Sequence, residues 1–520
     1  MIEAHAPTSA SVGRSNGDSP GDSPPVEAAP GVARSDVPTV SSERESLYAG
    51  RVKVYSKEAH GTFRMVKWIV MAVTLGIYYV LPWIRWDRGP YLPDQAVLID
   101  LPARRFYFFF LEIWPQEFYF ITGLLVLAAL ALFLVTSIAG RVWCGYTCPQ
   151  TVWTDLMIAV ERFWQGDRNA RLRLDKHPWA IETLSKKTAT HLSWLAISVA
   201  TGGAWVFYFA DAPTLAKELV SLDAPVAAYL FIGMFTATTY VLGGIAREQV
   251  CIYMCPWPRI QGAMFDRDSL LISYRAWRGE PHGPHRKGES WEDRGDCVDC
   301  RQCVAVCPTG IDIRNGPQLE CIQCALCIDA CDEIMTKVGR PTGLIAYDTV
   351  RNLDAGDVGA EPINLFRPRV ILYAAAMAVV GLIMLVALVM RPVLDVNVLH
   401  DRNPLYVRLS DGGVRNGYTV KLLNKLYLPR AFTIGVEGLP EAKIDLIGHE
   451  GGAVVPVPPD NMQSVRLYVT LDKTGVTALP GAATPFNFVI TDIANSARTE
   501  HAATFQGPSR QGPSRQGPSR

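Results

Sequence analysis

The sequence lacks net charge, a stretch typical of a cleaved signal peptide, and a basic stripe with interleaved aromatic residues. Its 50 Lys and Arg residues are balanced by 50 Asp and Glu residues, so nothing in its charge pattern indicates nucleic-acid binding. The first fifty residues have neither an apolar h-region nor a twin-arginine signal and are rich in Ser, Pro, Gly and Ala. We therefore expect a disordered cytoplasmic tail over residues 1–50.

Long apolar runs, in contrast, are abundant, and 49% of the residues are hydrophobic. Five runs have about the 17 to 25 residues that a membrane-spanning helix needs. They cover residues 68–84, 118–139, 192–210, 226–246 and 370–390. The second and fifth carry no charged residue, which argues against buried core helices. The pattern predicts a five-helix transmembrane bundle, with four of the helices in a membrane domain over residues 51–264.

Basic residues set the expected orientation. The segment between the second and third runs contains Arg162, Arg168, Arg171, Arg173, Lys176, Lys186 and Lys187, whereas the link after the third has only Lys217. Because basic loops stay inside, this segment should be cytoplasmic. Five spans then leave residues 1–50 and 265–368 in the cytoplasm and residues 392–505 in the periplasm of a bacterial inner membrane. Four arginines of the first external loop run against the rule: Arg85, Arg88, Arg104 and Arg105.

Eight of the twelve cysteines form two ferredoxin-type runs. The runs are Cys297-x2-Cys300-x2-Cys303-x3-Cys307-Pro308 and Cys321-x2-Cys324-x2-Cys327-x3-Cys331. In such pairs, the fourth cysteine of each run ligates the other cluster. The spacing therefore predicts one 4Fe-4S cluster on Cys297, Cys300, Cys303 and Cys331, and a second on Cys321, Cys324, Cys327 and Cys307. A zinc site or a disulfide framework is improbable for this spacing. Residues 265–368 should form a cytoplasmic two-cluster ferredoxin-like domain.

The other four cysteines form an internal repeat. Cys144-x3-Cys148-Pro149 follows the second run, and Cys251-x3-Cys255-Pro256 follows the fourth. Repeats in membrane proteins often build one site at their interface. Four thiolates there could bind Cu(I), zinc or a further iron-sulfur centre, or cycle between dithiol and disulfide, or be inert buried thiols. After Pro149 the apolar residues Val152, Trp153, Leu156, Met157, Val160, Phe163 and Trp164 recur at helical spacing. They predict a helix lying flat in the membrane interface.

Histidines carry weaker signals. No pair of histidines that could ligate a haem lies within the spans, where His191 stands alone. His282 and His285 form a weak metal motif in a loop rich in Gly and Pro, and Met254 is a weak candidate for a thioether ligand.

Beyond the fifth run the pattern changes to short alternating segments. They are 405–409, 418–422, 431–436, 443–447, 454–457, 465–471 and 486–490. Seven such segments indicate an antiparallel sandwich over residues 392–505. Three repeats of Gln-Gly-Pro-Ser-Arg follow, and we expect a disordered tail over residues 506–520.

Together these motifs resemble the cytochrome c oxidase accessory proteins called CcoG, FixG or RdxA. The resemblance rests on the paired Cys-x3-Cys-Pro motifs, the two-cluster insert, the fifth run, and the segments 400–407 and 415–419. Single motifs are shared with membrane polyferredoxins of the NapH and NosR types, but the combination with an immunoglobulin-like carboxyl-terminal domain is specific. It covers residues 45 to 505.

The resemblance implies a role in assembling the cbb-type haem-copper oxidase, with reduction of Cu(II) to Cu(I) as the chemistry. Copper would be the substrate, and Cys144, Cys148, Cys251 and Cys255 its candidate ligands. Expected partners are the membrane, oxidase subunits or copper-delivery proteins, and a soluble or quinol electron donor; a homodimer is reasonable for a small bundle. Two other functions stay open: an electron conduit of the NapH and NosR kind, and a non-enzymatic scaffold for oxidase subunits.

Overall fold

The computed structural model describes residues 53–508 except 91, 287, 357–361, 363, 392–393, 426–427, 449–453 and 460. The predicted tail over 1–50, and all but the first three residues of the predicted tail over 506–520, lie outside the described residues. The chain divides into two compact units. One unit takes the chain up to Ile77, then Ala129–Gly203 and Ala227–Ala374. The other takes Tyr78–Ala128, Ala204–Val226 and the chain from Ala375 onward.

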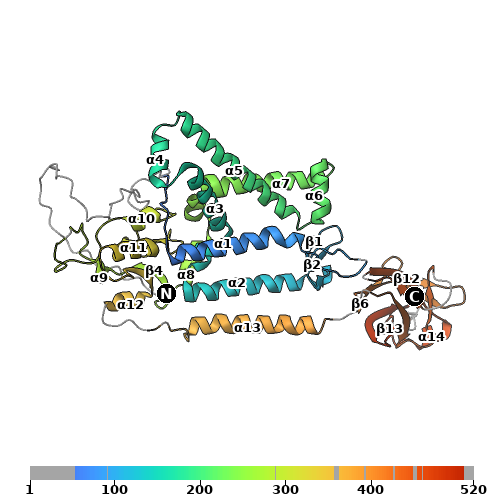
Figure 1. Cartoon of the computed structure of the whole chain (residues 1–520). Coiled ribbons are helices and arrows are strands. Elements are labelled where there is room, and N and C mark those ends of the chain that lie inside the picture. The colour runs from blue at the N-terminus through green and yellow to red at the C-terminus, as the bar shows by residue number, and fades with distance from the viewer. Residues whose placement is uncertain are drawn as a thin grey trace, which may run out of the picture. The chain divides into compact units, whose positions relative to one another are not determined.

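Helices make up much of the chain (Figure 1). The α-helices are α1 (Thr62–Val80), α2 (Tyr119–Ala139), α3 (Pro149–Gln165), α4 (Arg168–Lys176), α5 (Ile181–Val206), α6 (Ala212–Ser221), α7 (Val226–Thr239), α8 (Trp257–Met264), α9 (Ala276–Gly279), α10 (Gln302–Val306), α11 (Leu326–Lys337), α12 (Val350–Ala355), α13 (Pro368–Val389) and α14 (Lys473–Ala478). Short 3₁₀ turns cover Leu81–Trp83, Pro115–Glu117 and Ile313–Asn315. π-Helical turns cover Trp143–Thr147, Tyr240–Ala246 and Val250–Met254.

Four helical segments within the described residues are long and apolar enough to cross a membrane. They are Thr62–Trp83, Pro115–Ala139, Val226–Ala246 and Pro368–Val389. These correspond to four of the five predicted runs, although the first helix begins at Thr62 rather than at residue 68. The predicted third run is part of α5, which is long enough but less apolar than the other four, with His191 and several Ser, Thr and Gly residues. It ends at Val206 rather than at residue 210.

The cysteine-rich part of the first unit is a small α+β module. Its two strands, β4 (Leu271–Tyr274) and β5 (Ile345–Asp348), pair antiparallel, and α10 and α11 pack together beside them (Figure 1). Its core consists of apolar side chains such as Ile272, Val304 and Ile345 together with cysteines of both runs. The two ferredoxin runs thus form part of a folded core.

The second unit contains two groups of strands. β1 (Val97–Asp100), β2 (Arg105–Phe108) and β3 (Leu111–Ile113) form a small antiparallel sheet. The carboxyl-terminal strands are β6 (Leu394–His400), β7 (Val407–Arg408), β8 (Val414–Asn424), β9 (Arg430–Glu437), β10 (Lys443–Leu446), β11 (Val454–Val457), β12 (Asn461–Leu471), β13 (Ala483–Asp492) and β14 (Arg498–Gln506).

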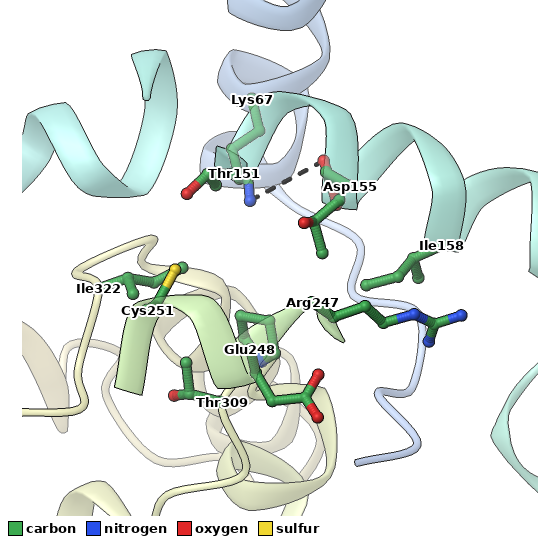
Figure 2. Close-up of a pocket in the computed structure, with 11 residues that line it drawn as sticks. Lys67, Thr151, Asp155, Ile158, Arg247, Glu248, Cys251, Thr309 and Ile322 are labelled. Atoms are coloured by element: carbon green, nitrogen blue, oxygen red, sulfur yellow. Dashed lines mark ion pairs between the residues drawn. The ribbon is translucent and has the colours of Figure 1, made fainter. Parts of the chain in front are cut away.

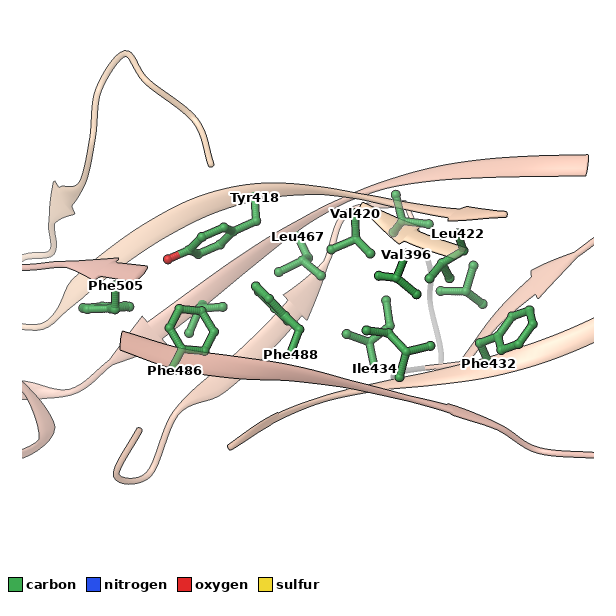
Figure 3. Packing of buried hydrophobic residues seen from close by; sticks show 14 of the residues in the cluster. Val396, Tyr418, Val420, Leu422, Phe432, Ile434, Leu467, Phe486, Phe488 and Phe505 are labelled. Carbon is green, nitrogen blue, oxygen red and sulfur yellow. The ribbon is translucent and has the colours of Figure 1, made fainter. Parts of the chain in front are cut away.

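The carboxyl-terminal strands form two packed antiparallel sheets. One has the order β10-β12-β8-β6, with β7 also paired to β8, and the other has the order β11-β9-β13-β14. Alternate residues point inward, as the pleat requires, so that Tyr418, Phe432 and Phe488 fill the core between the sheets (Figure 3). Each of the seven predicted strands has a counterpart, and the predictions missed β6 and β14.

Candidate iron-sulfur and thiol sites

The first cluster site is a cavity of about 370 Å³ in the cysteine-rich module. The cysteines that line it are Cys297, Cys300, Cys303 and Cys331. Cys303 lies on α10 and Cys331 on α11. Apolar side chains such as Ile334 and Leu344 line it as well, together with two arginines, Arg301 and Arg314.

The second cluster site is a cavity of about 340 Å³ beside it. The cysteines expected to act there, Cys307, Cys321, Cys324 and Cys327, all line it, and Cys303 lines it too. The last cysteine of each run therefore lies at the cavity of the other run, in the two groups that the spacing predicts.

The backbone between the cysteines bends in the same way in both runs. Asp299 and Arg301 flank Cys300 with φ of 48° and 55°, and Gln323 and Ala325 flank Cys324 with φ of 56° and 61°. Residues other than glycine adopt this left-handed conformation only where the surrounding structure imposes it. These bends turn successive cysteines toward one cavity, as a tight coil around a cluster requires.

The residues of both sites fit a polynuclear cluster better than a single ion. Four thiolates around one zinc ion, with bonds of about 2.3 Å, lie only about 3.8 Å apart. Among the described residues, no group of three or more Cys, His, Asp or Glu side chains is close enough to hold one metal ion. Cysteines that converge on one cavity at the spacing of a ferredoxin run are instead the donor set of a four-iron cluster.

Both Cys-x3-Cys-Pro motifs fold into π-helical turns. The backbone N–H of Cys148 donates to the carbonyl of Trp143 at 2.9 Å, and that of Cys255 donates to the carbonyl of Val250 at 2.8 Å. Pro149 then occupies the first turn of α3. The internal repeat is therefore structural as well as sequential, and π-helical turns are frequent at functional sites.

The four cysteines of this repeat, here called the thiol set, lie close enough together for the charge of one to affect the pKa of another. Burial raises the pKa of Cys144 to about 12, and the negative charges of Cys148, Cys251 and Cys255 add to the rise. Burial, with Cys148 and Cys255, likewise raises the pKa of Cys251 to about 12. These two thiols are therefore protonated near neutral pH in the metal-free protein, and no three members of the set lie within single-ion coordination distance.

The thiol set adjoins the second cluster site. Cys144 and Cys251 pack against one apolar cluster that contains Val306, Ile322 and Cys324. The Cys144 thiol also donates to Oε1 of Gln261 at 3.1 Å. No member of the thiol set lines the first cluster site.

A third cavity, of about 360 Å³, opens beside Cys251 (Figure 2). Its wall also includes Lys67, Asp155, Glu248 and Thr309. Nζ of Lys67 lies 3.8 Å from the carboxylate of Asp155. Burial alone would raise the pKa of Asp155, yet the positive charge of Lys67 and its neighbours lowers it below the usual range. The cavity thus presents ionised groups of both signs next to the half-buried thiol of Cys251.

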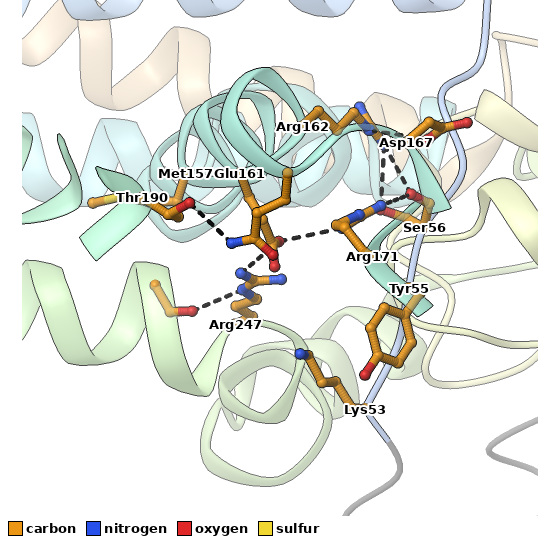
Figure 4. A network of polar contacts seen from close by, with 12 residues as sticks. Lys53, Tyr55, Ser56, Met157, Glu161, Arg162, Asp167, Arg171, Thr190 and Arg247 are labelled. Atoms are coloured by element: carbon orange, nitrogen blue, oxygen red, sulfur yellow. Dashed lines mark hydrogen bonds and ion pairs between the residues drawn. The ribbon is translucent and has the colours of Figure 1, made fainter. Parts of the chain in front are cut away.

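A second buried ionic network links α3 to the repeat (Figure 4). Oε2 of Glu161 lies 2.7 Å from Arg247 and 3.2 Å from Arg171, and all three side chains are buried. Neither Asp155 nor Glu161 was predicted from the sequence. The spacing of Thr151, Asp155, Ile158 and Glu161 on one helical face was the only available signal, because the partners are distant in sequence.

The predicted apolar face of α3 is only partly buried. Val152 and Met157 are buried, but Phe163 is 79% exposed and Trp164 is 40% exposed. The buried face instead contains Asp155 and Glu161, because arginines from other segments supply their ion-pair partners. Contact of Phe163 and Trp164 with a membrane interface stays a prediction.

The histidines considered as weak metal candidates have other contacts. Nδ1 of His282 lies 2.6 Å from the carboxylate of Glu280, and His285 stacks on Trp291. Met254 is exposed. Nδ1 of His191 lies 2.8 Å from the hydroxyl of Tyr240, which agrees with a structural role.

Three family models match the chain. Residues 246–350 match a 4Fe-4S dicluster domain, and residues 121–165 match a 4Fe-4S binding domain. Residues 384–508 match a model described as the IG-like fold at the C-terminal of FixG.

Curated relatives match almost the whole chain. The chain is 52% identical over 512 residues to the nitrogen fixation protein FixG of Rhizobium meliloti, covering 92% of this chain and 97% of that protein. It is 52% identical over 471 residues to protein RdxB of Cereibacter sphaeroides, covering 90% of this chain and 98% of that protein. Among solved structures, a FixG-related protein from Vibrio parahaemolyticus aligns with 23% identity and a TM-score of 0.19, covering 22% of this chain and 96% of that one.

Proposed function

The chain belongs to the FixG and RdxA family, and from this premise we propose that it is a membrane-bound cupric reductase serving the assembly of a cbb-type oxidase. It is a multidomain membrane protein with 4Fe-4S binding domains. The observation that carries the proposal is the packing of Cys144 and Cys251 against the same apolar cluster as Cys324. Two thiols of the thiol set, whose sulfur atoms are soft donors, therefore pack next to a cysteine of the second cluster site.

The chemistry divides between the two kinds of site. Clusters held by the first and second cluster sites supply single electrons at low potential. Copper is the substrate of the thiol set, whose thiolates prefer Cu(I). Each Cu(II) takes up one electron and becomes Cu(I), and a soluble one-electron donor or a quinol replaces that electron. Because Cys144 and Cys251 are protonated without metal, their coordination of copper releases protons.

The proposal includes a membrane topology. α5 is the third of five spans, the cluster sites face the cytoplasm, and the immunoglobulin-like domain faces the periplasm. The support is the basic segment before α5, although the ion pair between Arg171 and Glu161 neutralises part of its charge. With Trp179→Cys and Leu405→Cys in intact cells, a membrane-impermeant maleimide should label only the second. Labelling of Trp179→Cys alone would reverse the topology.

The decisive experiment follows the electron and the metal together. The purified protein is reduced without oxygen, Cu(II) is added, and electron paramagnetic resonance (EPR) records both the clusters and the copper. Loss of the Cu(II) signal together with the reduced-cluster signal, at one electron per copper, is the expected result. Clusters that stay reduced beside unreduced copper would favour the electron conduit or the scaffold.

Variants separate the thiol set from the clusters. Replacing all four cysteines of the thiol set by serine should abolish cupric reduction while both cluster signals remain. His282→Ala is the matched control, because it removes a metal-binding side chain outside the thiol set and should leave reduction intact. Reduction that persists without the thiol set would move the copper site elsewhere.

A further iron-sulfur centre on the thiol set is the second candidate. The specific observation is the match of residues 121–165 to a 4Fe-4S binding domain, a segment in which Cys144 and Cys148 are the only cysteines. Iron analysis distinguishes the candidates, since two four-iron clusters give about eight irons per chain. An iron content above that value, lost on replacing the thiol set, would support the second candidate.

A further inference from the structure

Arg141 joins three segments at the start of the first Cys-x3-Cys motif. Its backbone N–H donates to Oε1 of Gln323 at 2.7 Å. Nη1 of its side chain donates to the carbonyls of Leu319 and Cys321, the latter at 3.2 Å, and Nη2 donates to that of Pro258 at 2.7 Å. One buried residue therefore ties the first motif to the ligand loop of the second cluster site and to the segment after the second motif.

The first motif also touches that ligand loop directly. A Cβ atom on Gly145, between Cys144 and Cys148, would lie 2.6 Å from the carbonyl oxygen of Gln323 and 2.9 Å from that of Ile322. Only glycine allows the two backbones to approach this closely. The contact joins the first motif to the loop between Cys321 and Cys324.

The charges around the two cluster sites differ. Within the described residues, every hydrogen bond of the Arg141 guanidinium goes to a carbonyl oxygen, so its positive charge is not neutralised by a carboxylate. Two arginines, Arg301 and Arg314, line the first cluster site, and Arg314 forms ion pairs with Asp299 and Asp312 at 2.7 Å. The two positive charges there are therefore matched by two carboxylates. The positive charge of Arg141 lies near Cys321, and that of Lys67 lies near Cys324.

Other charges near the sites do not cancel this difference. Lys67 and Arg64 share one carboxylate, that of Asp155, which leaves an excess of positive charge on the side of the second cluster site. Arg278 and Arg340 share the carboxylate of Asp296 next to the first cluster site. The side chain of Arg340 is 35% exposed, however, and water screens an exposed charge.

We propose that Arg141 is a positioning residue that couples the thiol set to the second cluster site and raises the reduction potential of that site above that of the first. A reduced cluster is more negative than an oxidised one, so an uncompensated cation stabilises the reduced form. The inference rests on the proposed function in assigning the thiol set as the electron acceptor. The second cluster site is then the exit toward the thiol set.

The test is a redox titration of the full-length protein followed by EPR. Cys300→Ser, in a ligand of the first cluster site, identifies that site's signal. In the unaltered protein the second cluster site should have the more positive potential. Arg141→Gln should lower it enough to change the ratio of reduced to oxidised cluster at a fixed potential about tenfold, which is 59 mV for one electron. Arg141→Lys keeps the positive charge, so the potential of the second cluster site should stay close to that of the unaltered protein.

Two further variants keep the test decisive if Arg141→Gln does not fold. Lys67→Met removes the other cation and should also lower the potential of the second site alone. Asp299→Asn removes a carboxylate beside the first site and should raise the potential of that site alone. A more positive potential at the first site, or an unchanged second site in both Arg141→Gln and Lys67→Met, would overturn the inference. Because potentials are measured without copper, the absence of cupric reduction would refute the proposed function and leave this result standing.

Discussion

The two Cys-x3-Cys-Pro motifs have the same backbone but different surroundings. Both form a π-helical turn closed by the N–H of the second cysteine. The residue after the first cysteine is Gly145 in one motif, where a ligand loop lies against it, and Ile252 in the other. Cys144 donates to Gln261, whereas Cys251 lines an open cavity. Local sequence thus determines the turn, and the module packed against each turn determines what its thiols contact.

The arginines before the two motifs make reciprocal contacts. Arg141 precedes the first motif and binds the carbonyl of Pro258, in α8 after the second. Arg247 precedes the second motif and pairs with Glu161, in α3 after the first. Each motif is therefore anchored by the helix that follows the other. The two anchors differ in strength, since one is a hydrogen bond to a carbonyl and the other is a buried ion pair.

Glu161→Gln should cause the largest loss of stability, because it breaks the second anchor, which is the buried ion pair. It leaves Arg171 and Arg247 buried without a negative partner, which costs about 3 to 5 kcal/mol. Thermal unfolding in detergent, followed by tryptophan fluorescence, measures the loss. Glu182→Gln is the matched control: its pair with Lys186 is exposed and is worth less than about 1 kcal/mol. Equal effects of the two changes would contradict the role of the network.

Gly145→Ala tests the difference at the position after the first cysteine. The added methyl group meets the Gln323 carbonyl at 2.6 Å, and overpacking of this kind costs about 1 to 3 kcal/mol. The EPR signal of the second cluster site should change as well, because the ligand loop must shift. Ile252→Ala, at the same place in the other motif, should leave both cluster signals unchanged. A changed signal in Ile252→Ala alone would reverse the comparison.

Gln261→Leu removes a contact that only the first motif has. Cys144 loses its hydrogen-bond acceptor, and Thr136, which accepts from Gln261 at 3.2 Å, loses its donor. Each lost hydrogen bond costs about 1 kcal/mol. The same unfolding measurement in Cys251→Ser provides the comparison, and a neutral result for Gln261→Leu would show that the first motif does not depend on this contact.

Phe163→Ser should have the smallest effect. The side chain lies near the end of α3 and is 79% exposed, and exposed substitutions usually change stability by less than about 0.5 kcal/mol. Unfolding in detergent should therefore be unchanged. A larger loss would mean that α3 is anchored through this face as well as through Glu161.

Much of the fold could be predicted from the sequence because its signals are local. Long apolar runs indicate membrane spans. The alternation of apolar and polar residues predicted seven strands, and each of them has a counterpart in the structure. β14 was missed because much of its sequence, from Arg498 to Gln506, is polar or alanine. β6 was missed although Val396 and Val398 alternate within it, because it follows closely after an apolar helix.

The sequence singled out the cysteines of the candidate sites but not their charged neighbours. Each cavity is lined by the four cysteines expected there, with Cys303 at both, and their role as cluster ligands stays a prediction. Asp155, Glu161 and Arg141 look like ordinary helix or loop residues, because their partners lie far away in sequence. A π-helical turn also differs from an α-helical one by a single hydrogen-bond step, which the spacing of two cysteines does not reveal.

Asp329 connects the cysteine-rich module to the start of α1. It lies on α11 between Cys327 and Cys331, and its carboxylate accepts the backbone N–H groups of Phe63 and Arg64 in the first turn of α1. The start of α1 is therefore capped by a carboxylate of the cysteine-rich module. A long apolar helix thus begins where it does because of a side chain that lies 265 residues later in the sequence than Arg64.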